Sequence, residues 1–207
     1  MTADDPTGWF ERLYAAAAVG AADVPWERGG PHPLLDAWAR GRDGAGRRAL
    51  VVGAGLGHDA ELLAGLGFDT LAFDVSPTAV RSARARFPGS RVRYLTADLL
   101  DPPVQWIGAF DLVAEVFTVQ SLPEPHRGRA IANVARMVAP GGTLVVVAAG
   151  REAGEAANGP PWPLTRAEID AFAAGGLEVV RVEDLRDTPG PGERRWRAEL
   201  RRGAAGP

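Results

Sequence analysis

Short apolar runs alternate with amphipathic segments along most of this chain. The apolar runs predict strands at 48–53, 69–74, 91–96, 110–115, 143–149, 177–183 and 194–201. Apolar residues at helical spacing predict helices at 57–66, 77–87, 126–139 and 166–175. The alternation indicates an α/β fold, in which a doubly wound, mostly parallel, seven-stranded sheet carries helices on both faces.

The end of the chain departs from this alternation. Helix 166–175 is followed by two predicted strands with no helix between them, and the connecting residues 187–192 are rich in proline and glycine. So short a connection favours antiparallel neighbours, because a parallel crossover needs roughly a dozen residues or more. The last strand is therefore expected to run antiparallel.

Residues 1–46 precede the first strand and are expected to form a helical cap. The pattern predicts helices over 9–19 and 33–40, with Trp26 in the loop between them. The aromatic residues of this segment either pack onto the sheet or form a lid that excludes water from a bound ligand. We predict one domain overall, with a cap at 1–46 and a ligand-binding body at 47–207.

Three glycines at alternate positions, Gly53, Gly55 and Gly57, follow the first strand directly. Without Cβ atoms the backbone can turn sharply, and a ligand can approach the main chain closely. The second strand ends in Asp74, and an acid about twenty residues after such a turn can accept both hydroxyls of a ribose. These features predict a site for a nucleoside cofactor.

Two further acids end predicted strands. Asp98 follows the third strand and Glu115 ends the fourth. Ligands of open parallel sheets bind beyond the carboxyl ends of the strands, so we expect these acids at the same edge as Asp74, with Asp98 near an adenine amino group. A dinucleotide fingerprint places its glycines first, third and sixth. Here the sixth position is His58, which argues against a nicotinamide cofactor.

Composition excludes several kinds of chemistry. The 207 residues contain no cysteine and no lysine, which rules out disulfides, thiolate sites, Schiff bases and the Tyr-x-x-x-Lys pair of short-chain dehydrogenases. No metal site is expected from three scattered histidines. The net charge is −3 and the basic residues form only short clusters, so a nucleic-acid partner is not expected.

The same patterns give an expectation about location and partners. No apolar run approaches the roughly 20 residues that cross a bilayer. The first residues are acidic, unlike those of a secretory signal. We expect a cytoplasmic protein without a membrane partner, acting on a small molecule as a monomer or a homodimer.

From about residue 46 to residue 201 the chain resembles the class I S-adenosylmethionine-dependent methyltransferases. The resemblance rests on the ordered segments Val51–Gly57, Asp74, Thr96–Leu99, Phe110–Val113 and Val138–Leu144. It implies S-adenosyl-L-methionine as the cofactor and S-adenosyl-L-homocysteine as the product. The implied cofactor contacts are Gly53, Ala54 and Gly55 under the methionine portion, Asp74 and Val75 at the ribose, Asp98 and Leu99 at the adenine, and Glu115 and Trp26.

One branch of this family is more similar than others. Many members carry an acid where Val51 stands, whereas the thiopurine and thiol methyltransferase branch resembles this chain in having Val there and Asp59 at the start of the next helix. Trp26 before a Gly-Pro turn and the segment after Glu115 are also similar to that branch. The branch acts on small molecules, which makes a small methyl acceptor the implied substrate.

Methyl transfer needs alignment of the acceptor and, for a protonated acceptor, a base. Candidate catalytic residues are Glu115, as a strand-end acid, and His32, which could equally be a packing residue of the cap. Candidate substrate contacts are Tyr14 in the cap and Arg151 and Trp162 in the glycine-rich loop after the fifth strand. Arg151 and Trp162 could equally be ordinary loop residues.

Two other functions remain open at this stage. A nicotinamide-dependent oxidoreductase shares the general strand, turn and helix pattern. A regulatory protein that binds the cofactor without turnover is compatible with Val51. Nucleic-acid methylation is disfavoured, because the segment after 110–113 lacks the Pro-Pro motif that clamps a flipped base.

Overall fold

A computed structural model describes residues 5–186 and 194–204 of the chain. Its strands are β1 (Arg48–Val52), β2 (Asp69–Asp74), β3 (Arg93–Thr96), β4 (Phe110–Val116), β5 (Val138–Ala149), β6 (Leu177–Leu185) and β7 (Arg195–Arg202). Its α-helices are α1 (Gly8–Ala18), α2 (Pro33–Ala39), α3 (His58–Gly65), α4 (Pro77–Arg86), α5 (Glu124–Met137) and α6 (Arg166–Asp170). Short 3-10 helices cover Val104–Trp106, Val119–Ser121 and Ala171–Gly175.

The strands form one seven-stranded sheet in the order β3-β2-β1-β4-β5-β7-β6. The last strand, β7, lies between β5 and β6 and pairs antiparallel with both. The predicted doubly wound, mostly parallel sheet with an antiparallel last strand is therefore confirmed. The predicted turn at 187–192 lies outside the described residues.

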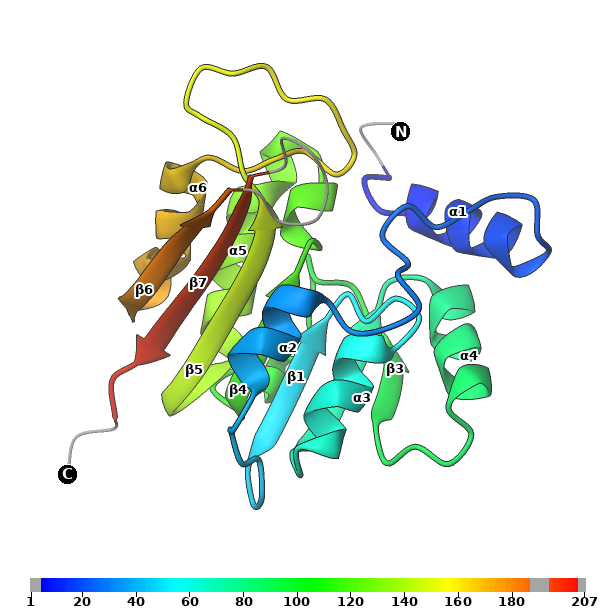
Figure 1. The fold of residues 1–207 in the computed structure, drawn as a ribbon, viewed down its shortest axis with the longest axis horizontal. Coiled ribbons are helices and arrows are strands. Elements are labelled where there is room, and N and C mark those ends of the chain that lie inside the picture. Colours follow the sequence, from blue (N-terminus) through cyan, green and yellow to red (C-terminus); the bar gives the residue numbers. More distant parts are fainter. Residues whose placement is uncertain (1–4, 187–193, 205–207) are drawn as a thin grey trace. The chain divides into compact units, whose positions relative to one another are not determined.

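The chain falls into two compact halves, Met1–Pro102 and Pro103–Pro207. The first half contains β1, β2 and β3, which pair in parallel from Arg48 opposite Asp69 and from Leu71 opposite Arg93. In this half α3 and α4 pack on the strands, and α1 packs beside α4 (Figure 1). The prediction of a cap at 1–46 and a body at 47–207 stays a prediction.

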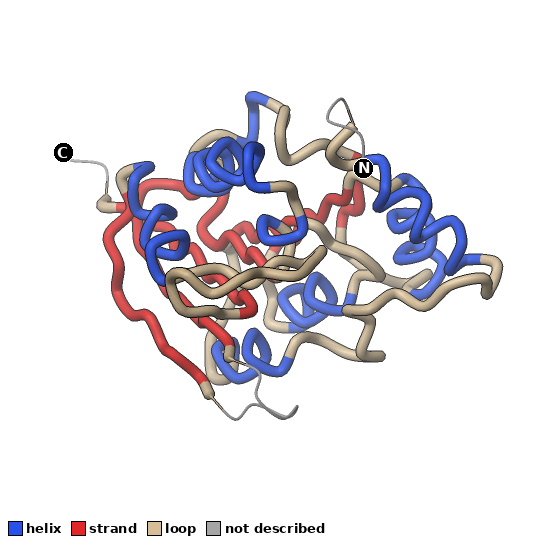
Figure 2. Tube along the Cα trace, turned by 90° about the horizontal axis from the view of Figure 1, so that it is seen from above, coloured by secondary structure: helices blue, strands red, loops and turns tan. Residues whose placement is uncertain are grey.

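The second half contains β4 and β5, which pair in parallel, and the antiparallel strands β6 and β7, which run side by side (Figure 2). The predicted start of β5 was wrong: we expected Pro140–Gly142 to precede the strand, but β5 begins at Val138. Val138 pairs with Phe110, and the register then shifts so that Leu112 lies opposite Thr143. The irregular segment between these pairs absorbs the proline and the glycines.

The helix predicted at 166–175 is α-helical only over Arg166–Asp170 and continues as a 3-10 helix, and the helix predicted to reach residue 139 ends at Met137, where β5 takes over. The other boundaries agree closely with the apolar pattern. β1 and the middle of β5 are buried at successive positions, because parallel strands covered on both faces are apolar throughout. Ser76 caps α4 as expected by accepting a hydrogen bond from the Ala79 N–H, and Thr165 and Glu168 form the expected capping box of α6. In the described ranges, no helix combines the length and apolar character needed to cross a membrane.

Candidate functional site

The turn after β1 adopts a conformation that only glycine accommodates easily. Gly53, Gly55 and Gly57 have φ angles of 63°, 51° and 96°, in the left-handed region. The Ala54 N–H donates to the Phe73 carbonyl at 2.8 Å, which ties the turn to β2. The three alternate glycines are thus required by the backbone path from β1 into α3.

Asp74 ends β2 with its carboxylate directed at this turn. Its Oδ2 accepts from the Gly55 N–H and its Oδ1 from the Ser76 N–H, both at 2.9 Å. Burial raises the pKa of Asp74 to about 6, although hydrogen bonds from Ser76, Gly55 and Val75 act in the opposite direction. The two carboxylate oxygens have about four lone-pair sites, so the three backbone hydrogen bonds leave the fixed carboxylate able to accept a further one.

The segment after β3 lies next to Asp74. The Ala97 N–H donates to the Asp74 carbonyl at 3.1 Å, and Asp98 Oδ1 accepts from the Leu100 N–H at 2.8 Å. Leu99 between them is 6% exposed. The ends of β1, β2 and β3 therefore present the predicted residues side by side within the first half.

Tyr14 of α1 reaches the glycine turn. A Cβ built on Gly55 would lie 2.9 Å from the Tyr14 hydroxyl and 4.0 Å from Trp26 Nε1. Trp26 Nε1 donates to the Tyr14 hydroxyl at 2.8 Å, and burial, followed by the charge of Asp74, raises the pKa of Tyr14. Tyr14, predicted as a substrate contact, thus lies with Trp26 at the predicted cofactor turn.

Glu11 holds α1 in this place, and sequence reasoning missed it. Its Oε2 accepts from the Ser76 hydroxyl at 2.5 Å and the Thr78 N–H at 3.1 Å, and its Oε1 accepts from the Thr78 hydroxyl at 2.5 Å. Burial favours the neutral acid, but these hydrogen bonds and the charge of Arg81 outweigh it and lower the pKa of Glu11. One carboxylate therefore fastens the cap to the first turn of α4.

His32, a predicted catalytic residue, has a visible structural role. Its Nδ1 accepts from the Leu34 N–H at 3.2 Å, which caps α2, and its own N–H donates to Asp59 Oδ1 at 2.7 Å. The cap-packing alternative for this residue accounts for these contacts. Its catalytic role stays a prediction.

Glu115 lies in the second half, at the end of β4, and is 1% exposed. Its Oε1 accepts from the Thr118 N–H at 2.8 Å and the Val119 N–H at 2.9 Å, whereas Oε2 has no hydrogen-bond partner among the described residues. Burial raises the pKa of Glu115 to about 7, against the effect of both backbone bonds. A carboxyl of this kind can hold or release a proton near neutral pH.

Gln120 follows in the same turn and was not among the predicted site residues. It is also 1% exposed. Its Oε1 accepts from the Ala149 N–H at 2.7 Å, and its carbonyl accepts from the Trp162 N–H at 2.8 Å. Within the described residues its Nε2 has no partner. Only the polar character of Gln120 in an apolar stretch could have indicated a role.

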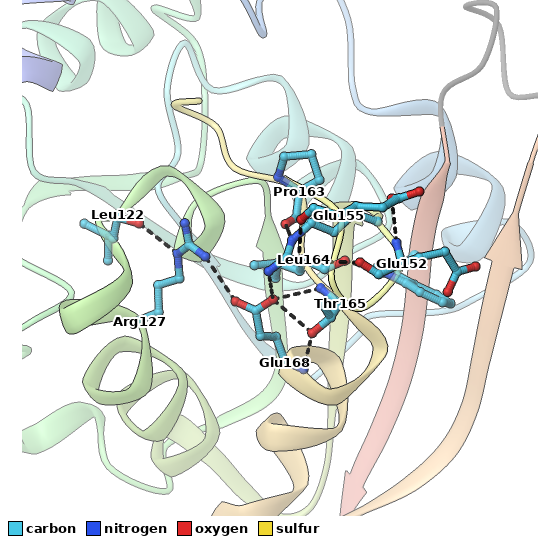
Figure 3. Close-up of polar contacts among 10 residues, drawn as sticks. Leu122, Arg127, Glu152, Glu155, Pro163, Leu164, Thr165 and Glu168 are labelled. Atoms are coloured by element: carbon cyan, nitrogen blue, oxygen red, sulfur yellow. Dashed lines mark hydrogen bonds and ion pairs between the residues drawn. The ribbon is translucent and has the colours of Figure 1, made fainter. Parts of the chain in front are cut away.

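Arg151 and Trp162, the predicted substrate contacts of the second half, belong to one braced loop. Arg151 donates to the carbonyls of Pro163 at 2.9 Å and Glu155 at 3.1 Å. Glu168 Oε1 accepts from Arg127 at 3.0 Å (Figure 3). Its Oε2 lies 3.5 Å from Arg151. The Arg127 guanidinium also lies 5.4 Å from the centre of the Trp162 ring. The ion pairs fix the loop on α5 and α6.

Residues 49–142 match the family model described as methyltransferase domain. The chain is 32% identical over 148 residues to the ubiquinone biosynthesis O-methyltransferase of Xanthomonas oryzae, which covers 67% of this chain and 61% of the relative. It is 24% identical over 198 residues to probable thiol methyltransferase 2 of Arabidopsis thaliana, covering 92% and 83%. The chain also matches the demethylmenaquinone methyltransferase of Clavibacter sepedonicus, and the match spans about half, 48%, of that relative's length.

A solved structure has the same fold. The 1,6-didemethyltoxoflavin-N1-methyltransferase of Burkholderia thailandensis, which holds 1,6-didemethyltoxoflavin and S-adenosylhomocysteine, superposes with a TM-score of 0.66 at 18% identity. The match covers 83% of this chain and 77% of that one.

Proposed function

Because this chain belongs to the class I S-adenosylmethionine-dependent methyltransferases, we propose that it transfers a methyl group to an oxygen, nitrogen or sulfur atom of a small molecule. The observation that supports this most directly is the Asp74 carboxylate, held 2.9 Å from the Gly55 N–H. This contact places an acid that can accept a further hydrogen bond beside a turn of glycines with left-handed backbone angles. Such an arrangement suits the ribose diol of the cofactor and its methionine portion.

The residues of the first half fit the cofactor. The proposed contacts are the predicted set Gly53, Ala54, Gly55, Asp74, Val75, Asp98, Leu99 and Trp26. When bound, S-adenosylmethionine supplies an electrophilic methyl group on a sulfonium sulfur. Tyr14 and Trp26 would shield that part of the site from water, since their joined polar atoms lie over Gly55.

Glu115 is the proposed base. Its near-neutral pKa and unpartnered Oε2 suit it to take a proton from the acceptor. Glu115 is also proposed to contact the cofactor, as predicted from the sequence. Of the two predicted bases, the contacts favour Glu115, since the Nδ1 of His32 already accepts a backbone hydrogen bond.

Arg151 is proposed to shape the acceptor loop through its bonds to Pro163 and Glu168. Trp162 and Tyr14 are proposed to contact the acceptor. We also propose a cytoplasmic monomer or homodimer with no nucleic-acid partner, as the net charge of −3 suggests. The nicotinamide and regulatory alternatives gain no support from these observations.

The test combines binding with turnover. Calorimetry with S-adenosylhomocysteine should show micromolar binding, and NADH should give no heat under the same conditions. Labelled methyl groups should pass from S-adenosylmethionine to members of a broad panel of small phenols, thiols and amines. Binding of NADH in place of S-adenosylhomocysteine would reverse the assignment, and tight binding without transfer to any acceptor would favour the regulatory alternative.

A further inference from the structure

The turn after β4 buries two polar atoms that have no partner within the described part of the chain, Glu115 Oε2 and Gln120 Nε2. Both residues are 1% exposed. Buried polar groups in folded proteins are nearly always hydrogen-bonded, because leaving one unpaired costs its full desolvation. The two residues lie five positions apart in the sequence, and each leaves one polar atom for which a polar ligand would supply the missing bond.

The other polar atoms of these side chains fix how each is oriented. Glu115 Oε1 is held by two backbone N–H groups, of Thr118 and Val119, so Oε2 is the oxygen left over. The Ala149 N–H binds the Gln120 oxygen, which identifies the free atom as the amide nitrogen. The turn therefore offers one acceptor, the carboxylate, and one donor, the amide.

We propose that these two atoms bind a methyl acceptor that carries a hydroxyl group: Glu115 Oε2 accepts the hydroxyl proton, and Gln120 Nε2 donates to an oxygen of the same molecule. This inference rests on the proposed function and narrows it to oxygen acceptors. A hydroxyl oxygen donates and accepts strongly, whereas a thiol is weak in both roles and would leave the buried amide poorly satisfied.

The proposed step balances without a further reactant. A bond forms between the acceptor oxygen and the methyl carbon while the bond between that carbon and the sulfonium sulfur breaks, and its electron pair stays on the sulfur. The hydroxyl proton passes to the Glu115 carboxylate, which later releases it to solvent. Gln120 loses and gains no proton and serves as a binding residue for the acceptor.

The loop that carries Trp162 is part of the same arrangement. The Gln120 carbonyl accepts from the Trp162 N–H, and Glu168 joins Arg127 and Arg151 beneath that loop. Gln120 thus connects the turn after β4, the end of β5 and the Trp162 loop. A hydroxyl on an aromatic ring is a fitting acceptor, because Trp162 gives the loop an aromatic face for the ring.

The experiment compares the wild-type chain with Gln120→Glu, Gln120→Leu and Glu115→Gln. Gln120→Glu keeps an oxygen for the Ala149 N–H and replaces the amide donor by a second carboxyl oxygen, whereas Gln120→Leu removes the donor without adding an acid. The matched control is Ser121→Ala, which removes the 2.7 Å bond from the Ser121 hydroxyl to the Phe117 carbonyl in the same turn and neither proposed contact. Thermal unfolding shows first that each variant is folded.

The probes are ring-matched pairs, 4-nitrophenol with 4-nitrothiophenol and 4-nitrocatechol with its dithiol. Their binding is measured by absorbance in the presence of S-adenosylhomocysteine, without turnover, and the spectrum of the nitrophenols reports whether the hydroxyl is ionised. Labelled methyl transfer is measured separately.

Wild-type protein should bind the hydroxyl probes as phenolates and methylate them in preference to the thiols. Both Gln120 variants should weaken binding of the hydroxyl probes about tenfold or more, which is the loss expected for one buried hydrogen bond. Binding of the thiol probes should weaken less than about threefold. Glu115→Gln should lower the fraction of bound probe that is ionised relative to the wild type, and this comparison does not depend on the Gln120 variants being folded. Ser121→Ala should change none of these.

Three results would overturn the inference. They are a preference for thiols, an equal loss for both probe types in a folded Gln120 variant, and binding of S-adenosylhomocysteine by a protein that takes up none of the hydroxyl probes. Failure of the proposed function gives a different result, since S-adenosylhomocysteine itself would then not bind.

Discussion

Asp74 and Glu115 are buried carboxyl groups at the carboxyl ends of two strands, β2 and β4, and their surroundings differ. In the first half, both oxygens of Asp74 accept backbone hydrogen bonds, from Gly55 and Ser76. In the second half, one oxygen of Glu115 accepts two such bonds and the other accepts none among the described residues. Burial raises the pKa of both, to about 6 and about 7.

The difference in contacts supports the proposal that Asp74 binds a ligand and that Glu115 transfers a proton. A carboxylate fixed through both oxygens keeps its charge and geometry, which suits the recognition of a diol. A carboxylate fixed through one oxygen leaves the other free to gain and lose a proton, and its pKa near neutrality makes that exchange useful. We therefore propose that similar burial serves two tasks, and that the backbone contacts decide which.

The largest expected effect is on turnover. Replacing Glu115 by Gln keeps an oxygen for the Thr118 and Val119 N–H groups and removes the base, so kcat for a hydroxyl acceptor should fall roughly a hundredfold or more. The dissociation constant of S-adenosylhomocysteine should change much less than kcat, since Glu115 is the only proposed cofactor contact that is altered and those of the first half are untouched. Steady-state kinetics and calorimetry on the same samples measure both quantities.

A matched variant is Asp111→Asn, which changes another acid of β4. Its kcat should stay close to the wild-type value. Equal losses of kcat in the two variants would mean that Glu115 acts only through the structure of the strand.

The reverse result is expected for Asp74. Asp74→Ala should weaken binding of S-adenosylhomocysteine about ten- to a hundredfold, because the charged hydrogen bonds proposed to the ribose would be lost. Asp69→Ala, at the opposite end of β2 and paired with Arg93 on the surface, is the control and should bind normally. Unchanged affinity in a folded Asp74→Ala protein would refute the ribose assignment.

The sequence pattern predicted the region around Asp74 better than the region around Glu115. The central strands β1, β2, β4 and β5 followed from apolar runs, because buried parallel strands are apolar on both faces. The glycine turn and Asp74 were recognisable because left-handed backbone angles call for glycine, which leaves a mark in the sequence. The early start of β5 was missed because Pro140–Gly142 looks like a break and is an irregularity within the strand.

Residues whose roles depend on distant partners left no such mark. Glu11 binds Ser76 and Thr78, 65 and 67 positions away, and nothing in the α1 sequence points to them. Gln120 became visible only through its bonds to Ala149 and Trp162. Sequence spacing shows backbone requirements, whereas the contacts of side chains follow only from the folded chain.

The raised pKa values also predict how stability depends on pH. The folded chain holds the Glu115 proton up to about pH 7, whereas the unfolded chain releases it near the ordinary value of 4.5. Between these values the unfolded state binds fewer protons, so the free energy of unfolding should fall as pH rises. Asp74 acts in the same direction between its ordinary 3.8 and about 6.

The Gln side chain of the Glu115→Gln variant cannot ionise. Between pH 5 and pH 8 the free energy of unfolding of this variant should therefore fall by roughly 1–3 kcal/mol less than that of the wild type. Chemical denaturation at pH 5, 6, 7 and 8 measures the difference. The Asp111→Asn control should follow the wild-type curve. Parallel curves for Glu115→Gln and wild type would contradict the assigned burial of the Glu115 carboxyl.

The smallest expected effect concerns the acid that acts on the site through Tyr14. Glu11 fastens α1 to Ser76 and Thr78, and α1 places the Tyr14 hydroxyl at the Gly55 turn. Glu11→Gln keeps one acceptor oxygen and loses the charge, which should cost about 0.5–1.5 kcal/mol of stability. Binding of S-adenosylhomocysteine should weaken only about two- to fivefold, because Asp74 and the glycine turn stay in place.

Arg12→Gln, on the exposed side of the same helix, should leave both the stability and the affinity unchanged. Calorimetry and thermal unfolding decide the outcome, and an affinity loss as large as that of Asp74→Ala would show that the cap, and not the strand-end acid, dominates cofactor binding.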